Sequence, residues 1–188
     1  MKVYLLSAIF SLGIVSGCKT QVPVEPQEAK TTPVVPLTVG NKWIVRMTDH
    51  TSNSAFTDSI VVIKDTSIYN EQWFSMPSFS LFGRDTNYYT NRSDGLYKLI
   101  NDTARLFLKN PTGAGQSYFL IQTHVKVVST QDTLVVPAGQ FICYHYDLGG
   151  FDQYWYAPGV GVIRQEQYNY SGTWNKLSTI DLLAYSIK

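Results

Sequence analysis

Hydrophobic and polar residues alternate along much of this chain, as they do in β-strands that bury one face. Residues 133–164 show the pattern most clearly, because corners at residues 137–139, 149–150 and 158–161 separate the alternating runs. Each corner contains Gly or Pro, and these residues end a strand or turn the chain because Gly permits positive φ and Pro lacks a backbone N–H. In the run after the first corner, one face is predicted to carry Ile142, Tyr144, Tyr146 and Leu148, and the other face Phe141, Cys143, His145 and Asp147.

Similar runs with turn residues between them fill the rest of the chain. The sequence Asp94-Gly95 between two aromatic-rich runs predicts a hairpin. Residues 177–187 fit a strand better than a helix, although Leu177, Ile180 and Leu183 also have helical spacing. The pattern favours an all-β fold with few or no helices, in which one curved antiparallel sheet forms a half-barrel or barrel. The further predicted strands are residues 42–48, 56–65, 68–76, 87–92, 96–101, 104–109 and 117–130.

The composition suits a single globular domain with an apolar core. Hydrophobic residues make up 44% of the 188 residues, aromatic residues 14% and charged residues 15%. The charged fraction lies below the roughly 25% of an average domain, and the formal net charge is +1. A mixed, nearly neutral charge distribution gives no electrostatic basis for binding nucleic acid or an anionic membrane surface.

The first residues have the features of a bacterial signal peptide. Lys2 is followed by a nearly uncharged apolar stretch, residues 3–15, which is too short to span a bilayer comfortably. The stretch ends in Val15-Ser16-Gly17-Cys18, which resembles a lipobox. The resemblance implies cleavage of residues 1–17 and a diacylglycerol on the Cys18 sulfur, and two acyl chains are enough for stable anchoring. The alternative is an ordinary secretory signal in which Cys18 falls at this position by chance.

The residue after Cys18 bears on which membrane carries the anchor. It is Lys19, whereas an Asp here would have resembled an inner-membrane retention signal. The predicted address is therefore the bacterial cell envelope, with the lipid in the outer membrane and the domain facing the periplasm. Residues 18–38 hold four of the eight prolines and are predicted to form an extended tether of up to roughly 60 Å. The β domain is then predicted to begin at Val39 and to cover residues 39–188.

The chain contains His, Cys and Asp residues that could act in catalysis or bind a metal, but their spacing does not predict a catalytic or metal site. His50, His124 and His145 fall on different predicted strands, so no metal site is predicted. Cys143, His145 and Asp147 share one face, but residues two apart on a strand stand about 6.6 Å apart, beyond the roughly 3 Å that a nucleophile and its base require. The sequence also lacks a Gly-x-Ser-x-Gly elbow and a phosphate-binding loop. No catalytic residue and no cofactor are predicted.

Aromatic side chains are concentrated between residues 141 and 156. Aromatic residues on antiparallel strands ordinarily pair across the ladder and fill the core. They can also line a concave sheet and form a pocket for an apolar ligand. In the second interpretation the candidate ligand-binding residues are Tyr144, Tyr146, Trp155 and Tyr156.

Two motifs resemble those of a large set of bacterial envelope proteins of unknown function. They are Val135-Val136-Pro137-Ala138-Gly139-Gln140-Phe141-Ile142-Cys143 and Tyr154-Trp155-Tyr156-Ala157-Pro158-Gly159-Val160-Gly161-Val162, and Gly40-Asn41-Lys42-Trp43 is similar to the usual start of these domains. Such domains resemble the lipoprotein-carrier (LolA/LolB-like) superfamily, which implies a half-barrel around an apolar cavity and transfers no catalytic residues.

Two functions remain open at this stage, and neither is enzymatic. In the first, the concave aromatic face binds an apolar ligand such as an acyl chain. In the second, the chain is an interaction module for another envelope protein, with a fully packed core and an exposed apolar patch. The predicted partners are the membrane, through the lipid on Cys18, and either a small apolar molecule or an envelope protein.

Overall fold

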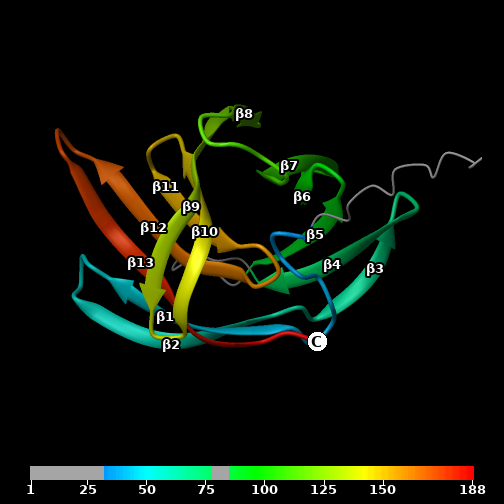
Figure 1. Ribbon diagram of the computed structural model, residues 1–188, viewed down its shortest axis with the longest axis horizontal. Coiled ribbons are helices and arrows are strands. Elements are labelled where there is room, and N and C mark those ends of the chain that lie inside the picture. The colour runs from blue at the N-terminus through cyan, green and yellow to red at the C-terminus, as the bar shows by residue number, and fades with distance from the viewer. Residues whose placement is uncertain (1–31, 78–84) are drawn as a thin grey trace, which may run out of the picture. The chain divides into compact units, whose positions relative to one another are not determined.

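The computed structural model describes residues 32–77 and 85–188 (Figure 1). The regular secondary structure within these ranges consists of β-strands, which form two antiparallel sheets. No helix in this part of the chain is long and apolar enough to cross a membrane. The all-β, antiparallel prediction is therefore confirmed, whereas the expected single sheet is replaced by two.

The larger sheet has eight strands in the order β2-β1-β13-β12-β11-β10-β9-β8. It is curved but not closed, so its shape is consistent with the predicted half-barrel (Figure 1). Its strands are β1 Lys42–Asp49, β2 Ser54–Val61, β8 Ser117–Leu120, β9 Thr123–Val136, β10 Gly139–Leu148, β11 Asp152–Ala157, β12 Gly161–Tyr170 and β13 Trp174–Ser186.

The smaller sheet is a five-stranded meander, in which each strand pairs with the next one in the chain. The predicted Asp94-Gly95 hairpin is confirmed as the turn between its third and fourth strands. Its strands are β3 Lys64–Ile68, β4 Glu71–Pro77, β5 Thr86–Arg92, β6 Gly95–Ile100 and β7 Thr103–Lys109.

Turns that the sequence did not reveal explain the second sheet and the division of one predicted strand of the larger sheet. The predicted strand 56–65 ends at Val61, and the chain then enters the other sheet at Lys64. Tyr69 and Asn70 both have positive φ and form the turn of the β3–β4 hairpin inside the predicted strand 68–76. Ile121, with φ of 57°, begins the turn that divides residues 117–130 into β8 and β9. Non-glycine residues with positive φ leave no mark on hydrophobic periodicity, so these turns were missed.

The core lies between the two sheets and is rich in aromatic side chains. The rings of Phe107 in β7 and Tyr154 in β11 pack edge to face, with centroids 5.7 Å apart. The Tyr146 hydroxyl donates a hydrogen bond of 2.8 Å to the Lys109 carbonyl and so also joins the sheets. Trp43 is completely buried, and its indole N–H donates to the Val160 carbonyl at 2.6 Å. A buried ring with its polar group paired stabilises the contact without a desolvation penalty.

The segment before β1 is part of this core, which corrects the predicted boundary at Val39. Val34 and Val35 expose only 1% and 2% of their surface, and Leu37 is also buried. The Val35 carbonyl accepts a hydrogen bond from the Asn91 side chain in β5. Residues 32–38 are therefore packed chain rather than tether. The predicted signal peptide, Cys18 and tether residues 18–31 lie outside the described residues.

The same segment also links the two sheets through its backbone. On the side of the smaller sheet, the Thr32 carbonyl accepts a hydrogen bond from the side chain of Asn110, which directly follows β7. On the side of the larger sheet, the backbone N–H of Gly159, in the β11–β12 turn, donates to the Pro33 carbonyl at 2.8 Å. We call residues 32–38 the N-terminal strap.

The hairpin formed by β9 and β10 extends beyond β11, and this changes which side chains of β10 are covered. Only residues from Tyr144 onward pair with β11, and the register of β9 against β10 shifts on both sides of His145. Ile142, predicted to share a face with Tyr146, is 66% exposed, whereas Cys143 is fully buried. The turn of this hairpin rests on β13, where the Ala138 N–H donates to the Leu182 carbonyl.

Candidate functional site

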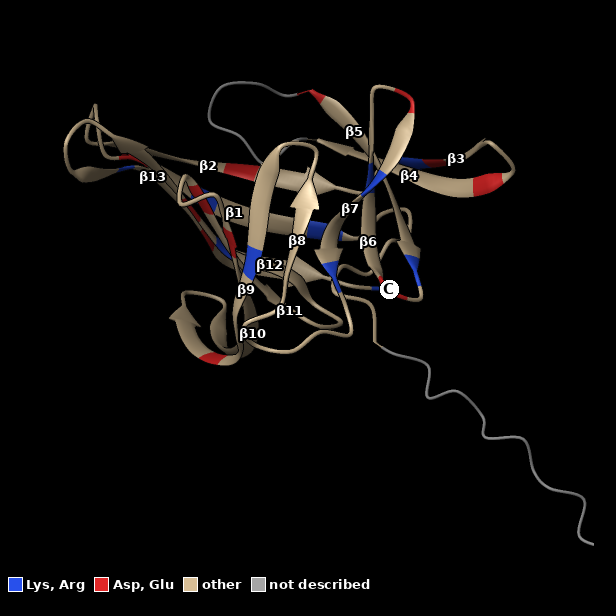
Figure 2. Ribbon diagram, turned by 90° about the horizontal axis from the view of Figure 1, so that it is seen from above, with Lys and Arg blue, Asp and Glu red and all other residues tan. Residues whose placement is uncertain are grey.

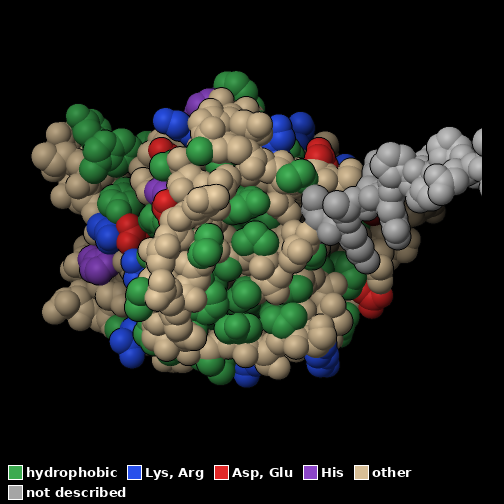
Figure 3. All heavy atoms as spheres, viewed as in Figure 1, with side chains coloured by type: hydrophobic (Ala, Val, Ile, Leu, Met, Phe, Trp, Pro, Cys, Tyr) green, Lys and Arg blue, Asp and Glu red, His purple; other side chains and the backbone are tan. Residues whose placement is uncertain are grey.

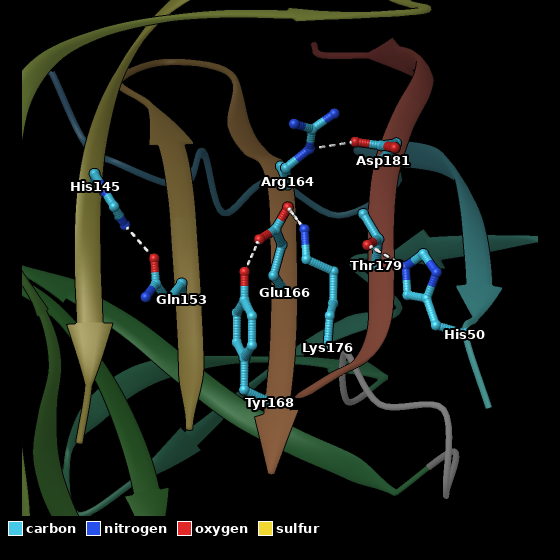
Figure 4. A network of polar contacts seen from close by, with 9 residues as sticks. All are labelled: His50, His145, Gln153, Arg164, Glu166, Tyr168, Lys176, Thr179 and Asp181. Atoms are coloured by element: carbon cyan, nitrogen blue, oxygen red, sulfur yellow. Dashed lines mark hydrogen bonds and ion pairs between the residues drawn. The ribbon is translucent and has the colours of Figure 1, made fainter. Parts of the chain in front are cut away.

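One face of the larger sheet carries a row of charged and polar side chains from neighbouring strands (Figure 4). Arg164 in β12 is opposite both Asp181 in β13 and Trp155 in β11, so the three side chains stand side by side. The Arg164 Nε donates to Asp181 Oδ1 at 2.6 Å, and both side chains are about one quarter exposed. The row continues to His145, which stacks on Trp155 with ring centroids 4.2 Å apart.

Glu166 is the most buried ionic group of this polar face. Its carboxylate accepts hydrogen bonds from the Lys176 ammonium at 2.8 Å and from the Tyr168 hydroxyl at 2.5 Å (Figure 4). Burial by itself would raise the pKa of Glu166, but these hydrogen bonds outweigh it and the pKa lies below its ordinary value. Glu166 is therefore held as a carboxylate inside an ion pair and is poorly suited to act as a proton donor.

The remaining members of this face are also paired with neighbours. His145 contacts Gln153 through Nε2 at 2.8 Å and Asp132 through Nδ1 at 3.2 Å. His50 contacts the Thr179 hydroxyl at 2.9 Å. Among the nine residues drawn in Figure 4, each ionic group has a partner within the same face. Such a network stabilises the pairing of the strands and provides no activated catalytic group.

The structure separates the Cys-His-Asp combination considered from the sequence. Burial raises the pKa of the Cys143 thiol to about 12, so this thiol stays protonated at neutral pH. His145 is paired with Asp132 rather than with Asp147, and Asp147 accepts a hydrogen bond from the Gly150 N–H. Within residues 32–77 and 85–188, no group of three or more His, Cys, Asp or Glu side chains could hold a metal ion.

The four predicted ligand-binding residues do not form one surface. Tyr146 and Tyr156 expose 0% and 1% of their surface and belong to the core. Tyr144 is half-buried against Tyr146, with ring centroids 6.4 Å apart. Trp155 lies on the opposite face of the sheet, where its indole N–H donates to Asp132. The core-facing tyrosines are therefore engaged in packing between the sheets.

An exposed aromatic group joins the turns of two hairpins. Phe151, Tyr170 and Trp174 are 54%, 62% and 51% exposed. The Trp174 ring centroid lies 5.4 Å from that of Phe151 and 5.2 Å from that of Tyr170. We call these three residues the aromatic tip. In Figure 3, hydrophobic side chains gather at the projecting end of the β12–β13 hairpin.

The sequence did not identify the aromatic tip, because Phe151 and Trp174 come together only through strand pairing. The N–H of Tyr168 donates to the Phe151 carbonyl at 2.7 Å and holds the β10–β11 turn against β12. A local signal does exist, since each ring flanks a Gly- or Ser-containing turn at a strand end. A large aromatic residue at such a position faces solvent in the folded chain and is a candidate contact residue.

Comparison with known proteins identifies the fold. A candidate exported protein with a YmcC-like fold from Bacteroides fragilis matches with a TM-score of 0.52 and 14% identity, over 81% of this chain and 98% of that one. A candidate lipoprotein from Parabacteroides distasonis matches with a TM-score of 0.52 and 15% identity, over 83% and 99% of the two chains. The chain has a YmcC-like fold.

Neither protein-family models nor curated proteins gave a match to this chain. One of the two structural neighbours is described as a candidate exported protein and the other as a candidate lipoprotein. The Bacteroides fragilis protein is the one described as having a YmcC-like fold, and neither match bears on the resemblance to lipoprotein carriers. At these identities the likeness concerns the fold alone.

Proposed function

We propose that the chain is a lipid-anchored, non-enzymatic module of the bacterial envelope that works by docking through its aromatic tip. The observation that carries this proposal is the tip itself, in which Phe151 and Tyr170 both pack on Trp174 and each of the three rings is about half exposed. Exposed apolar surface that is gathered in one patch marks interaction sites far more often than scattered single residues do. The anchor is the predicted lipid on Cys18, and the outer membrane facing the periplasm is its proposed location.

The packed interior favours docking over storage of an apolar ligand between the sheets. Tyr146 and Tyr156 fill the space that a lipid tail would need, and the Tyr146 hydroxyl is bonded to the facing sheet. Entry of a ligand would require the sheets to separate and would leave that buried hydroxyl unpaired. Native mass spectrometry of the mature chain, from residue 18 onward, tests this alternative, and we expect no co-purified lipid in the core.

A non-catalytic role agrees with the state of the best candidate nucleophile. Cys143 is buried and protonated, and His145 is bonded to other partners. Activation of this thiol would require both its exposure and a base within hydrogen-bonding distance.

The docking proposal can be tested by site-specific photocrosslinking in living bacteria. A photoreactive phenylalanine analogue replaces Trp174 in the full-length chain, and a matched variant carries it at Tyr69. Tyr69 is a suitable control because it is 73% exposed in a hairpin turn of the other sheet. We expect adducts with protein or lipid from position 174 and few from position 69. Equal yields at the two positions would refute docking through the aromatic tip.

A further inference from the structure

We propose that the surface bound by the aromatic tip is the interfacial layer of a lipid bilayer, namely the membrane that holds the chain's own anchor. This inference deepens the proposed function and rests on it. It follows from the geometry of the tip, its charge, its area, and the reach of the chain that precedes the described residues.

The rings of the tip are supported by backbone and project outward. Gly150 has φ of +79°, and a Cβ atom at this position would lie 3.0 Å from the Trp174 ring. The indole therefore packs closely on the backbone of the neighbouring turn, where a Cβ at Gly150 would force the ring to shift by a few tenths of an ångström and where the positive φ favours glycine. With Phe151 on one side and Tyr170 on the other, Trp174 has a defined orientation at the end of its hairpin.

The turns that carry the tip contain no Asp, Glu, Lys, Arg or His. This holds for residues 149–151 and for residues 169–175. The first charge behind Trp174 is Lys176, which is already paired with Glu166 at 2.8 Å. The Asn175 side chain donates to Ser171 and Thr173, so polar groups of the turn are satisfied internally. The three rings and the turn between Tyr170 and Trp174 can thus enter a layer of low dielectric constant, whereas Asp147, which accepts the Gly150 N–H, and Asp152, next to Phe151 in the chain, must stay in water. Tyr and Trp are also the residues enriched at membrane–water interfaces.

The exposed area of the tip suits a membrane better than a protein partner. An aromatic side chain presents about 150–250 Å², and with exposures of 54%, 62% and 51% the three rings offer roughly 250–420 Å². A stable protein–protein interface buries about 800 Å² on each partner. A patch of half that size gives useful binding when an anchor keeps it close to its target, because the second contact is then intramolecular.

The chain between the anchor and the domain is long enough for this contact. Residues 18–31 span at most about 46–50 Å at 3.3–3.6 Å per residue. The strap meets the larger sheet at Gly159, in the turn before β12, whereas the aromatic tip lies at the other end of β12. The ten residues of β12 cover about 33 Å at 3.3 Å per residue. An anchor at Cys18 therefore leaves enough chain for the tip to touch the same membrane.

The test measures partitioning of the mature chain, from residue 18 onward, onto neutral phosphatidylcholine vesicles. Cys18→Ser removes the lipid, so that the tip alone provides the affinity. Brominated phosphatidylcholine reports contact by quenching tryptophan fluorescence. The reporter is Trp174, because Trp43 and Trp73 are buried and Trp155 is stacked on His145. We expect quenching that disappears in Trp174→Phe, and partitioning that is unchanged by 0.5 M salt because the tip is uncharged.

Replacing Tyr170 and Trp174 by Ser should weaken partitioning by at least about tenfold, since transfer of two half-exposed rings is lost. Both residues flank an exposed turn, and thermal unfolding verifies that the double variant is folded. Tyr69→Ser, which removes an isolated exposed ring, should leave partitioning unchanged. Equal partitioning of the wild type and the double variant, or no quenching by brominated lipid, would overturn the inference. Protein adducts from position 174 without vesicle binding would also overturn it while leaving the proposed function intact.

Discussion

The buried strap before β1 gives the most direct test of the structure, because the sequence alone assigns these residues to an extended tether. Val35→Ala removes two carbon atoms from a side chain that is 2% exposed. At about 0.8 kcal/mol per buried methylene the loss of transfer free energy is about 1.6 kcal/mol. An unrelaxed cavity of two methyl groups adds about 1 kcal/mol. We therefore expect the free energy of unfolding to fall by about 2–3 kcal/mol.

Urea denaturation of the mature chain measures this change, and thermal unfolding should show a decrease of roughly 5–10 °C in Tm for a domain of this size. Val39→Ala is the matched control, because Val39 is 39% exposed and lies only four residues later. Its replacement should cost less than about 0.5 kcal/mol. If Val35→Ala and Val39→Ala destabilise the chain equally little, residues 32–38 do not pack as described here.

Three further outcomes are expected. In a chain in which Cys143 is the sole thiol, a thiol reagent at pH 8 should react with the folded chain at least about a hundredfold more slowly than with the urea-unfolded chain, because burial raises the pKa of the Cys143 thiol to about 12. Equal reaction rates with the folded and unfolded chains would contradict this burial. Glu166→Gln should lower the free energy of unfolding by about 1–3 kcal/mol at pH 7. Despite its burial, Glu166 has a folded-state pKa below 4.5, so this loss of stability should shrink as the pH falls through that pKa; a loss that urea titrations find independent of pH would refute the ion pair. Gly161→Ala should destabilise the chain by about 1–3 kcal/mol more than Gly172→Ala. Both glycines have positive φ, but only a Cβ at Gly161 would meet the Trp43 indole, at 3.0 Å; equal Tm values of the two variants would argue against that contact.

The strands themselves could be predicted from alternation and turn residues, but their division into two sheets could not. Periodicity reports which side chains share a face and does not report which strands pair. The chain changes sheets at Val62 and Ile63, inside an apolar run that reads as one strand. The strap was missed because its prolines favour an extended spacer by composition, whereas Val34 and Val35 between them are buried by contacts distant in sequence.

The candidate ligand-binding residues also show what a sequence pattern cannot predict, namely which aromatic side chains are buried in the core. Aromatic density led to Tyr144, Tyr146, Trp155 and Tyr156, yet two of these residues fill the core and Trp155 lies on the polar face. Density alone cannot separate packing from exposure, because aromatic residues serve both. The aromatic tip depends on Phe151 meeting Trp174 across two hairpins, and no local sequence pattern encodes that contact.

The strap also determines how the domain bears mechanical load. In the proposed lipid-anchored chain, any pull on the domain is transmitted through the last bonds before its first strand. Here those bonds run from Thr32 to Asn110 and from Pro33 to Gly159, so the force divides between two sheets instead of peeling one edge strand away. Because several bonds must break together, the fold should resist extraction forces directed along its own N-terminus.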